Sequence, residues 1–234
     1  MSLAKTLCLG TVDAIVQHTG LVEGEPVDLV SAMSPEPVGV LRTWTGGKGV
    51  AKAVYCGLAV EAIGLDSHMV FAFTDTDSLV PHFTLDSVFG QGTFAFHLDL
   101  IPRAELASNL AYVDRVFAPL TATFEDVQSR AGLAPAAIGP RQRALMSPWM
   151  CVNRATDEAF LGMTEVVTAY RDHWFSLLAE GVPADLVSPV DLQTRDDRNR
   201  RALFSREVDP VWDTIERLIG EQSELIRLQL VSND

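Results

Sequence analysis

The sequence predicts an α+β fold, a sandwich of one antiparallel sheet with helices before and after it, built as a single domain over residues 1–234. Strand-like segments follow one another between residues 38 and 101, and glycine-containing turns join them as hairpins. Helical patterns precede and follow this run of strands, an order typical of α+β folds. A chain of 234 residues, 47% of them hydrophobic, is long enough to bury one large core.

The first helix is predicted over residues 2–17, because apolar side chains recur there at helical spacing before Gly20. The next elements are strands, predicted over residues 38–45, 52–60, 69–73, 83–89 and 94–101. Residues 46–49 (GGKG) and 90–92 (GQG) are interpreted as hairpin turns. The GGKG turn lacks the GxxxxGK[ST] spacing of a phosphate loop, and it joins two strands.

The second half of the chain is mainly helical. A helix is predicted over residues 104–131, which Pro119 can break, and a strand near a sheet edge over 145–152. Further helices are predicted from the N-cap Thr156 to Gly181, after an N-cap and N1 proline at Ser188-Pro189, and from about Pro210.

Composition and charge narrow the possible partners. The net charge of −13 argues against nucleic acid, which requires a basic surface. No apolar run approaches the roughly 20 residues that span a membrane. Three widely separated cysteines and the lack of a secretory pattern at the first residues predict a cytoplasmic protein with reduced thiols.

One local basic cluster departs from this acidic composition. Five arginines fall within twelve residues that contain only two acids, and they are Arg195, Arg198, Arg200, Arg201 and Arg206. The cluster is either a solvated helix face or a basic patch for an acidic partner or an anionic ligand.

The most informative chemistry lies in two adjacent strands. Side chains alternate between the faces of a strand, so His82 and Asp86 share one face of the first strand, and His97 and Asp99 share one face of the next. If the turn residues are Gln91-Gly92, Asp86 lies opposite His97, and all four side chains gather on one surface. A three-residue turn would separate the two sets.

Three interpretations of this surface remain open. It can be the solvated face of an amphipathic hairpin. His82, His97, Asp86 and Asp99 can hold a metal, since imidazole and carboxylate suit iron or manganese. Alternatively, Asp86 can act as a proton donor and acceptor in an apolar pocket, where burial raises the pKa of a carboxyl group.

The same residues resemble a known superfamily. Residues 81–88 (PHFTLDSV) resemble the strand of ferredoxin-dependent bilin reductases that carries their catalytic aspartate. Residues 98–106 (LDLIPRAEL) are closer to the related red chlorophyll catabolite reductases, which have a similar D-L-x-x-R-x-x-L stretch. Residues 147–149 (SPW), 152–154 (VNR) and 208–210 (VDP) match later motifs in the same order. The resemblance covers roughly residues 44–220.

The resemblance implies a three-layer α/β/α sandwich with a central antiparallel sheet, and an open-chain tetrapyrrole held between the sheet and the C-terminal helices. It implies that no metal or other cofactor is bound, and that reduced ferredoxin supplies the electrons. Asp86 becomes the catalytic proton relay and Asp209 a supporting catalytic carboxylate. His82, His97 and Arg154 become substrate-binding residues, Arg154 through a propionate. The arginine cluster becomes a candidate docking site for acidic ferredoxin.

The sequence also departs from the family pattern. An ungapped match places Met69 where several bilin reductases have a catalytic histidine, and the adjacent His68 is expected to point to the other face. Gly57 stands where one bilin reductase group has a glutamate. The first hypothesis is therefore a ferredoxin-dependent reductase of a linear tetrapyrrole, either a red chlorophyll catabolite or a bilin. The alternatives are a non-catalytic tetrapyrrole-binding protein and a metal-dependent His/Asp enzyme.

Overall fold

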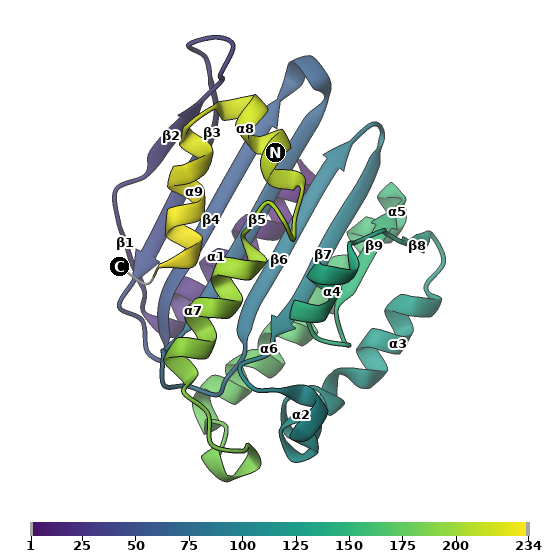
Figure 1. Ribbon diagram of the computed structural model, residues 1–234. Helices are drawn as coiled ribbons and strands as arrows, with labels where there is room; N and C mark the ends of the chain where they lie inside the picture. The colour runs from purple at the N-terminus through teal and green to yellow at the C-terminus, as the bar shows by residue number, and fades with distance from the viewer. Residues whose placement is uncertain (1, 233–234) are drawn as a thin grey trace.

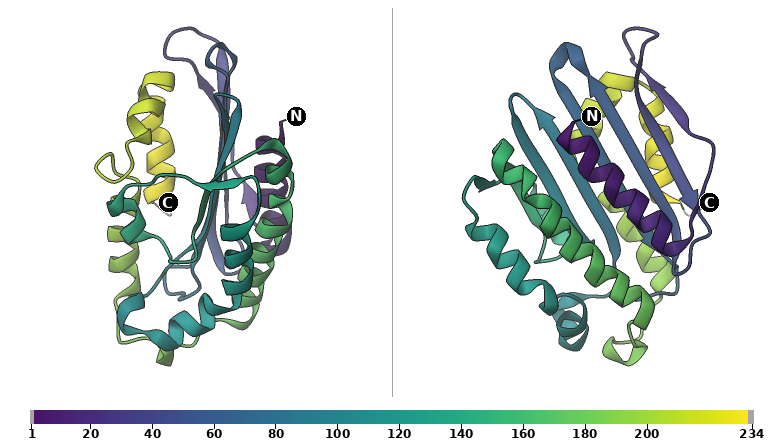
Figure 2. Two further views of the ribbon diagram at one scale, coloured as in Figure 1. Left: turned by 90° about the vertical axis from the view of Figure 1, so that its right-hand side faces the viewer. Right: turned by 180° about the vertical axis from the view of Figure 1, so that it is seen from behind.

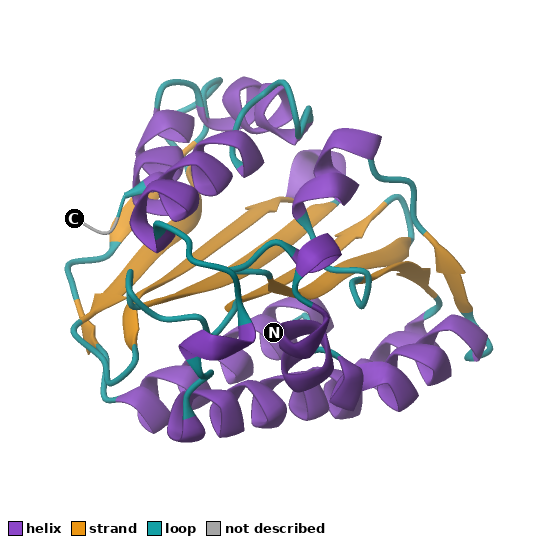
Figure 3. Cartoon of the chain, turned by 60° about the horizontal axis from the view of Figure 1, so that its bottom comes forward, coloured by secondary structure: helices purple, strands orange, loops and turns teal. Residues whose placement is uncertain are grey.

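The computed structural model describes residues 2–232 and confirms the three-layer α+β sandwich. Figure 3 shows the sheet between two layers of helices. Within the described residues the sheet has nine strands in the order β1-β3-β4-β5-β6-β7-β9-β8, and β2 pairs with β3. All strand pairs are antiparallel.

Five long strands form the centre of the sheet, each joined to the next along the chain. They are β3 (Pro37–Thr45), β4 (Val50–Val60), β5 (Leu65–Thr74), β6 (His82–Gly90) and β7 (Thr93–Ile101). Four short strands complete the edges: β1 (Val22–Glu23), β2 (Val27–Val30), β8 (Leu133–Pro135) and β9 (Cys151–Ala155). The two-residue turn between β6 and β7 is Gln91-Gly92, with φ values of 53° and 76°. This left-handed pair is what a tight hairpin turn requires.

Helices from the N-terminus and the middle of the chain cover one face of the sheet (Figure 2). This layer contains α1 (Leu3–Thr19), α2 (Leu110–Val116), α3 (Thr121–Ser129), α5 (Asp157–Leu161) and α6 (Met163–Glu180). Their buried side chains share one core with Trp44, Tyr55, Phe83 and Leu98 of the sheet. Because α1 packs against β4, β5 and β6, the predicted first helix becomes part of the central core.

The other face carries a second core under the C-terminal helices (Figure 1). This layer contains α4 (Pro140–Leu145), α7 (Leu192–Leu203), α8 (Val211–Ile219) and α9 (Gln222–Val231). Leu203, Trp212 and Ile226 from these helices pack against Phe71 and Phe73 of β5. Short 3-10 turns occur at Glu61–Ile63, Leu106–Ser108, Ala118–Leu120 and Ala184–Leu186.

Several predicted boundaries are wrong. The helix predicted over residues 104–131 begins only at Leu110, and the break anticipated at Pro119 is present as the 3-10 turn between α2 and α3. The strand predicted from residue 145 begins only at Cys151, because α4 and a loop precede it. Ser188-Pro189 does not open a helix; α7 begins at Leu192, where the Asp191 side chain accepts a hydrogen bond from the Thr194 amide. Among residues 2–232, no helix has the length and apolar character needed to cross a bilayer.

Candidate functional site

A row of five directly paired residues crosses the sheet on the face below the C-terminal helices. Cys56 of β4 pairs with Met69 of β5, which pairs with Asp86 of β6. Asp86 pairs with His97 of β7, and His97 with Val152 of β9. The alignment of Asp86 with His97 confirms the prediction based on a Gln91-Gly92 turn.

Asp86 and His97 form the polar centre of this row. His97 Nδ1 lies 3.4 Å from Asp86 Oδ2, and the side chains are 12% and 31% exposed, respectively. Burial lowers the pKa of His97, but the contact with Asp86 and the charges of Asp86, Asp99 and Asp209 outweigh it, so the pKa is raised. The Nε2 atom of His97 is buried and has no hydrogen-bond partner within residues 2–232. The imidazole can therefore share a proton with Asp86 through Nδ1, while Nε2 stays enclosed by protein.

Asp209 faces this pair from the helical layer, in the segment that leads into α8. Its Oδ1 accepts a hydrogen bond from the Val211 amide at 3.0 Å, and its Oδ2 accepts one from Gln142 Nε2 of α4 at 3.4 Å. Burial raises the pKa of Asp209, and the negative charge of Asp86 raises it further. The electrostatic coupling among Asp86, His97 and Asp209 joins residues from the sheet and from the helical wall in one site.

Asp99 lies two residues beyond His97 on the same face and is fully buried. Its Oδ2 accepts a hydrogen bond from the Ser147 amide at 2.9 Å, and its Oδ1 accepts one from the Ser147 hydroxyl at 2.5 Å. Burial raises the pKa of Asp99 to about 6, although His97 and Ser147 oppose the shift. Ser147, in the loop before β9, thus holds Asp99 in place beside His97. The sequence pattern alone suggested a chemical role for Asp99 only as a metal ligand.

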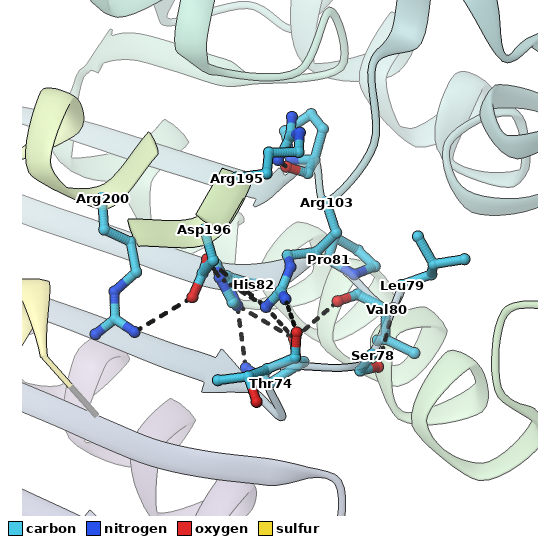
Figure 4. A network of polar contacts seen from close by, with 12 residues as sticks. Thr74, Ser78, Leu79, Val80, Pro81, His82, Arg103, Arg195, Asp196 and Arg200 are labelled. Atoms are coloured by element: carbon cyan, nitrogen blue, oxygen red, sulfur yellow. Dashed lines mark hydrogen bonds and ion pairs between the residues drawn. The ribbon is translucent and has the colours of Figure 1, made fainter. Parts of the chain in front are cut away.

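His82 lies on the same face but belongs to a separate, buried network beneath α7 (Figure 4). Its Nδ1 accepts a hydrogen bond from the Thr74 amide at 3.0 Å, and its Nε2 lies 2.6 Å from Asp196 Oδ1. Burial lowers the pKa of His82 to about 4. Since protein groups occupy both ring nitrogens, His82 anchors α7 in this structure and is not grouped with Asp86 and His97.

Arg154 follows Val152 by two residues on β9 and pairs with Ala95 of β7. It is exposed, and within residues 2–232 it forms no ion pair. The guanidinium therefore remains available at the β9 side of the row, where an anionic group of a ligand could reach it.

The departures from the family pattern have a structural explanation. Met69 lies beside Asp86, whereas His68 faces the α1 layer, as expected. Gly57 pairs with His68 and so faces away from Asp86; the residue beside Met69 on the Asp86 face is Cys56. The ungapped match aligns the family's glutamate with Gly57, but the β4 residue that faces this site is its neighbour Cys56.

The metal-dependent alternative has no geometric support in the part of the chain that the structure describes. Within residues 2–232, no group of three or more His, Cys, Asp or Glu side chains is arranged to hold a metal ion. His82 is engaged by Asp196, and both carboxylate oxygens of Asp99 are engaged by Ser147. Of the four side chains proposed as ligands, Asp86 and His97 contact each other, whereas His82 and Asp99 are held by other partners.

The arginine cluster is divided by the fold. Arg200 is buried and bonds to the Leu230 carbonyl, and Arg195 donates to the Pro102 and Ala104 carbonyls. Arg206 is exposed but forms ion pairs with acids that include Glu216. Only two members of the cluster, Arg198 and Arg201, are exposed without an ion pair within the described residues. A basic surface on α7 is therefore smaller than the sequence suggests.

Comparison with known proteins adds information about the fold. No protein-family model matches the sequence, and no curated protein shows significant similarity to it. Among solved structures, the chain is similar to phytochromobilin synthase from tomato in complex with biliverdin, with a TM-score of 0.75 and 16% sequence identity. The similarity covers 98% of this chain and 83% of the synthase chain. The chain therefore has the fold of a phytochromobilin synthase.

Proposed function

We propose that the protein is a ferredoxin-dependent reductase of a linear tetrapyrrole, either a red chlorophyll catabolite or a bilin. The observation that supports this most is the Asp86–His97 pair, faced by Asp209, on the sheet face below the C-terminal helices. The chain shares its fold with a synthase whose structure was solved in complex with biliverdin.

Reduction of one double bond consumes two electrons and two protons. Reduced ferredoxin would supply the electrons one at a time, and this chain's own residues would supply the protons. Asp86 is partly exposed, so a bound pigment can contact it. The raised pKa of His97 favours a protonated ring that returns a proton to Asp86 through Nδ1. Asp209 adds a carboxyl group from the opposite wall.

Binding of the substrate and of the electron donor involves other residues. Arg154 would hold a propionate, because a guanidinium pairs with a carboxylate in bidentate geometry. Arg198 and Arg201 on α7 would contribute to docking of acidic ferredoxin.

A non-catalytic tetrapyrrole-binding protein is the second candidate. Met69 favours it, since a thioether beside Asp86 can neither donate nor carry a proton. Both candidates predict pigment binding, and only the first predicts consumption of the pigment.

Substitution of Asp86 tests the proposed proton relay. In an anaerobic assay with reduced ferredoxin and biliverdin, we expect Asp86→Asn to keep the absorption shift of pigment binding and to lose about 100-fold or more in turnover. Asp114→Asn removes an exposed carboxylate on α2, in the other helical layer, and should leave turnover unchanged. Full turnover by Asp86→Asn would refute the relay, and pigment binding without bleaching by the unmodified protein would favour the second candidate.

A further inference from the structure

A groove of about 380 Å³ lies in the helical layer that contains α1, between α1 on one side and α5 and α6 on the other. Figure 2 shows α1 and α6 side by side on this face of the sheet. Buried apolar side chains form its base, and the exposed Leu3 and Leu161 lie at its rim. Its α1 wall extends from Leu3 to Thr11, which is about 12 Å along a helix. The groove is therefore elongated and open to solvent.

Arg171 of α6 is the only charged residue among the described residues that line the groove. Its Nε and NH2 atoms lie 3.1 Å and 2.8 Å from Asp172 Oδ1. Asp172 is 59% exposed, so this ion pair is weak. Arg171 NH1 has no partner within residues 2–232, and the guanidinium therefore keeps N–H donors for a ligand. The lining thus carries one positive charge and no carboxylate.

An aromatic contact closes the groove beyond Arg171. One helical turn further along α6, Phe175 stacks on His18 of α1, with ring centroids 3.9 Å apart and ring planes 4° from parallel. The guanidinium carbon of Arg171 lies 5.6 Å from the Phe175 ring centroid. The groove therefore has a cation at its closed end and the apolar side chains of Leu3 and Leu161 at the other.

Gly10 leaves the middle of the groove open. It lies inside α1, where glycine is less favourable than alanine. A Cβ atom added there would meet no other part of the chain within 4 Å. Contacts within the fold therefore do not require glycine at this position. The exposed backbone of Gly10 leaves room for a ligand to approach α1 closely.

We propose that this groove is a second ligand site, which binds an amphipathic carboxylate with an unbranched alkyl chain. The chain lies over Gly10 and contacts the apolar base, and the carboxylate pairs with Arg171, whose guanidinium offers bidentate geometry. The volume is at the lower end of the range for small-molecule sites. The proposal does not depend on the proposed reductase activity, because the groove and Asp86 lie on opposite faces of the sheet.

Three probes separate the contribution of the head group from that of the chain. We expect octanoate, titrated into the full-length protein, to shift the NMR signals of the Gly10 amide and the Thr168 methyl group. Octylammonium has a chain of the same length and the opposite charge, and it should bind at least about tenfold more weakly because Arg171 repels it. Acetate lacks the chain and should cause no such shifts at the same concentration.

Two pairs of substitutions make the test specific. Gly10→Leu fills the groove and should abolish octanoate binding, whereas Gln17→Leu adds the same side chain at an exposed position of α1 outside the groove and should leave binding unchanged. Arg171→Gln should weaken octanoate binding at least about fivefold and remove the preference over octylammonium. Arg217→Gln removes an exposed arginine of α8 and should change neither property.

Several results would overturn the proposal. They are the absence of octanoate binding, equal binding of octanoate and octylammonium, and octanoate binding that persists in Gly10→Leu or is unaffected by Arg171→Gln. Signals of Gly10 and Thr168 that change when the protein alone is diluted would also overturn it, because a second copy of the chain would then cover the groove. Asp86→Asn should bind octanoate normally, which separates this result from failure of the proposed reductase activity.

Discussion

At the residue scale, the two ring nitrogens of His97 have different surroundings. One contacts Asp86, and the other is buried without a partner in the described residues. The negative charge of Asp99 contributes to the raised pKa of His97, and burial raises the pKa of Asp99 itself. The protonation of His97 thus depends on a carboxyl group that is itself fully enclosed by protein.

The raised pKa of Asp99 predicts a pH-dependent stability. The folded protein binds a proton near pH 6 at this group, whereas the unfolded chain binds it only near the ordinary value of 3.8. The contribution of Asp99 to the free energy of unfolding therefore increases as the pH falls. Between pH 8 and pH 5 the gain is about 1.4 kcal/mol.

Asp99→Asn should abolish this gain, while its amide can still exchange hydrogen bonds with Ser147. Urea unfolding of both proteins at pH 8 and pH 5 measures the difference between their pH dependences. An identical change in both proteins would show that Asp99 does not titrate in this interval.

At the element scale, α7 is held to the sheet by buried charges. Asp196 lies 2.6 Å from His82 Nε2, 3.6 Å from Arg103 NH1 and 3.5 Å from Arg200 NH1. Arg200 also lies over the Phe73 ring, with its guanidinium carbon 3.7 Å from the ring centroid. The network links α7 to β5, β6 and the chain after β7, and so fixes the helix that precedes Asp209.

Removal of the Asp196 charge should destabilise the protein strongly. Asp196→Asn leaves Arg103 and Arg200 buried with less compensating charge, and we expect a loss of about 3–5 kcal/mol in the free energy of unfolding. The neighbouring Asp197 is exposed, so Asp197→Asn should change stability by less than about 0.5 kcal/mol. Equal denaturation midpoints for the two variants would show that the network does not anchor α7.

Local signals explain which elements and contacts could be predicted. The long strands, the tight β6–β7 turn and the Asp86–His97 alignment depend on alternation and on neighbouring residues. The partner of His82 is 114 residues away, and that of Asp99 is 48 residues away, so strand patterns could not identify them. Helix α9 was missed because Gly220, with a φ of 62°, marks the end of α8 just before α9 begins.

At the scale of the whole molecule, α7 carries a small basic surface on a protein whose net charge is −13. If Arg198 and Arg201 steer acidic ferredoxin, their reversal should slow electron delivery several-fold at low ionic strength and much less at high salt. Stopped-flow mixing of Arg198→Glu or Arg201→Glu with reduced ferredoxin and pigment measures this rate. Lys48→Glu changes the net charge equally at an exposed turn between β3 and β4 and serves as the control. Equal slowing by all three variants would contradict docking on α7.

The row that contains Asp86 and His97 lies in the interior of the sheet, with paired strands on both sides of β6 and β7. Amide hydrogens of such strands exchange with solvent mainly through global unfolding, whereas helices at the periphery can detach in smaller openings. The site therefore has a floor of high local stability. A bulky molecule that displaces side chains of the helical wall would leave the spacing of Asp86 and His97 on this floor unchanged.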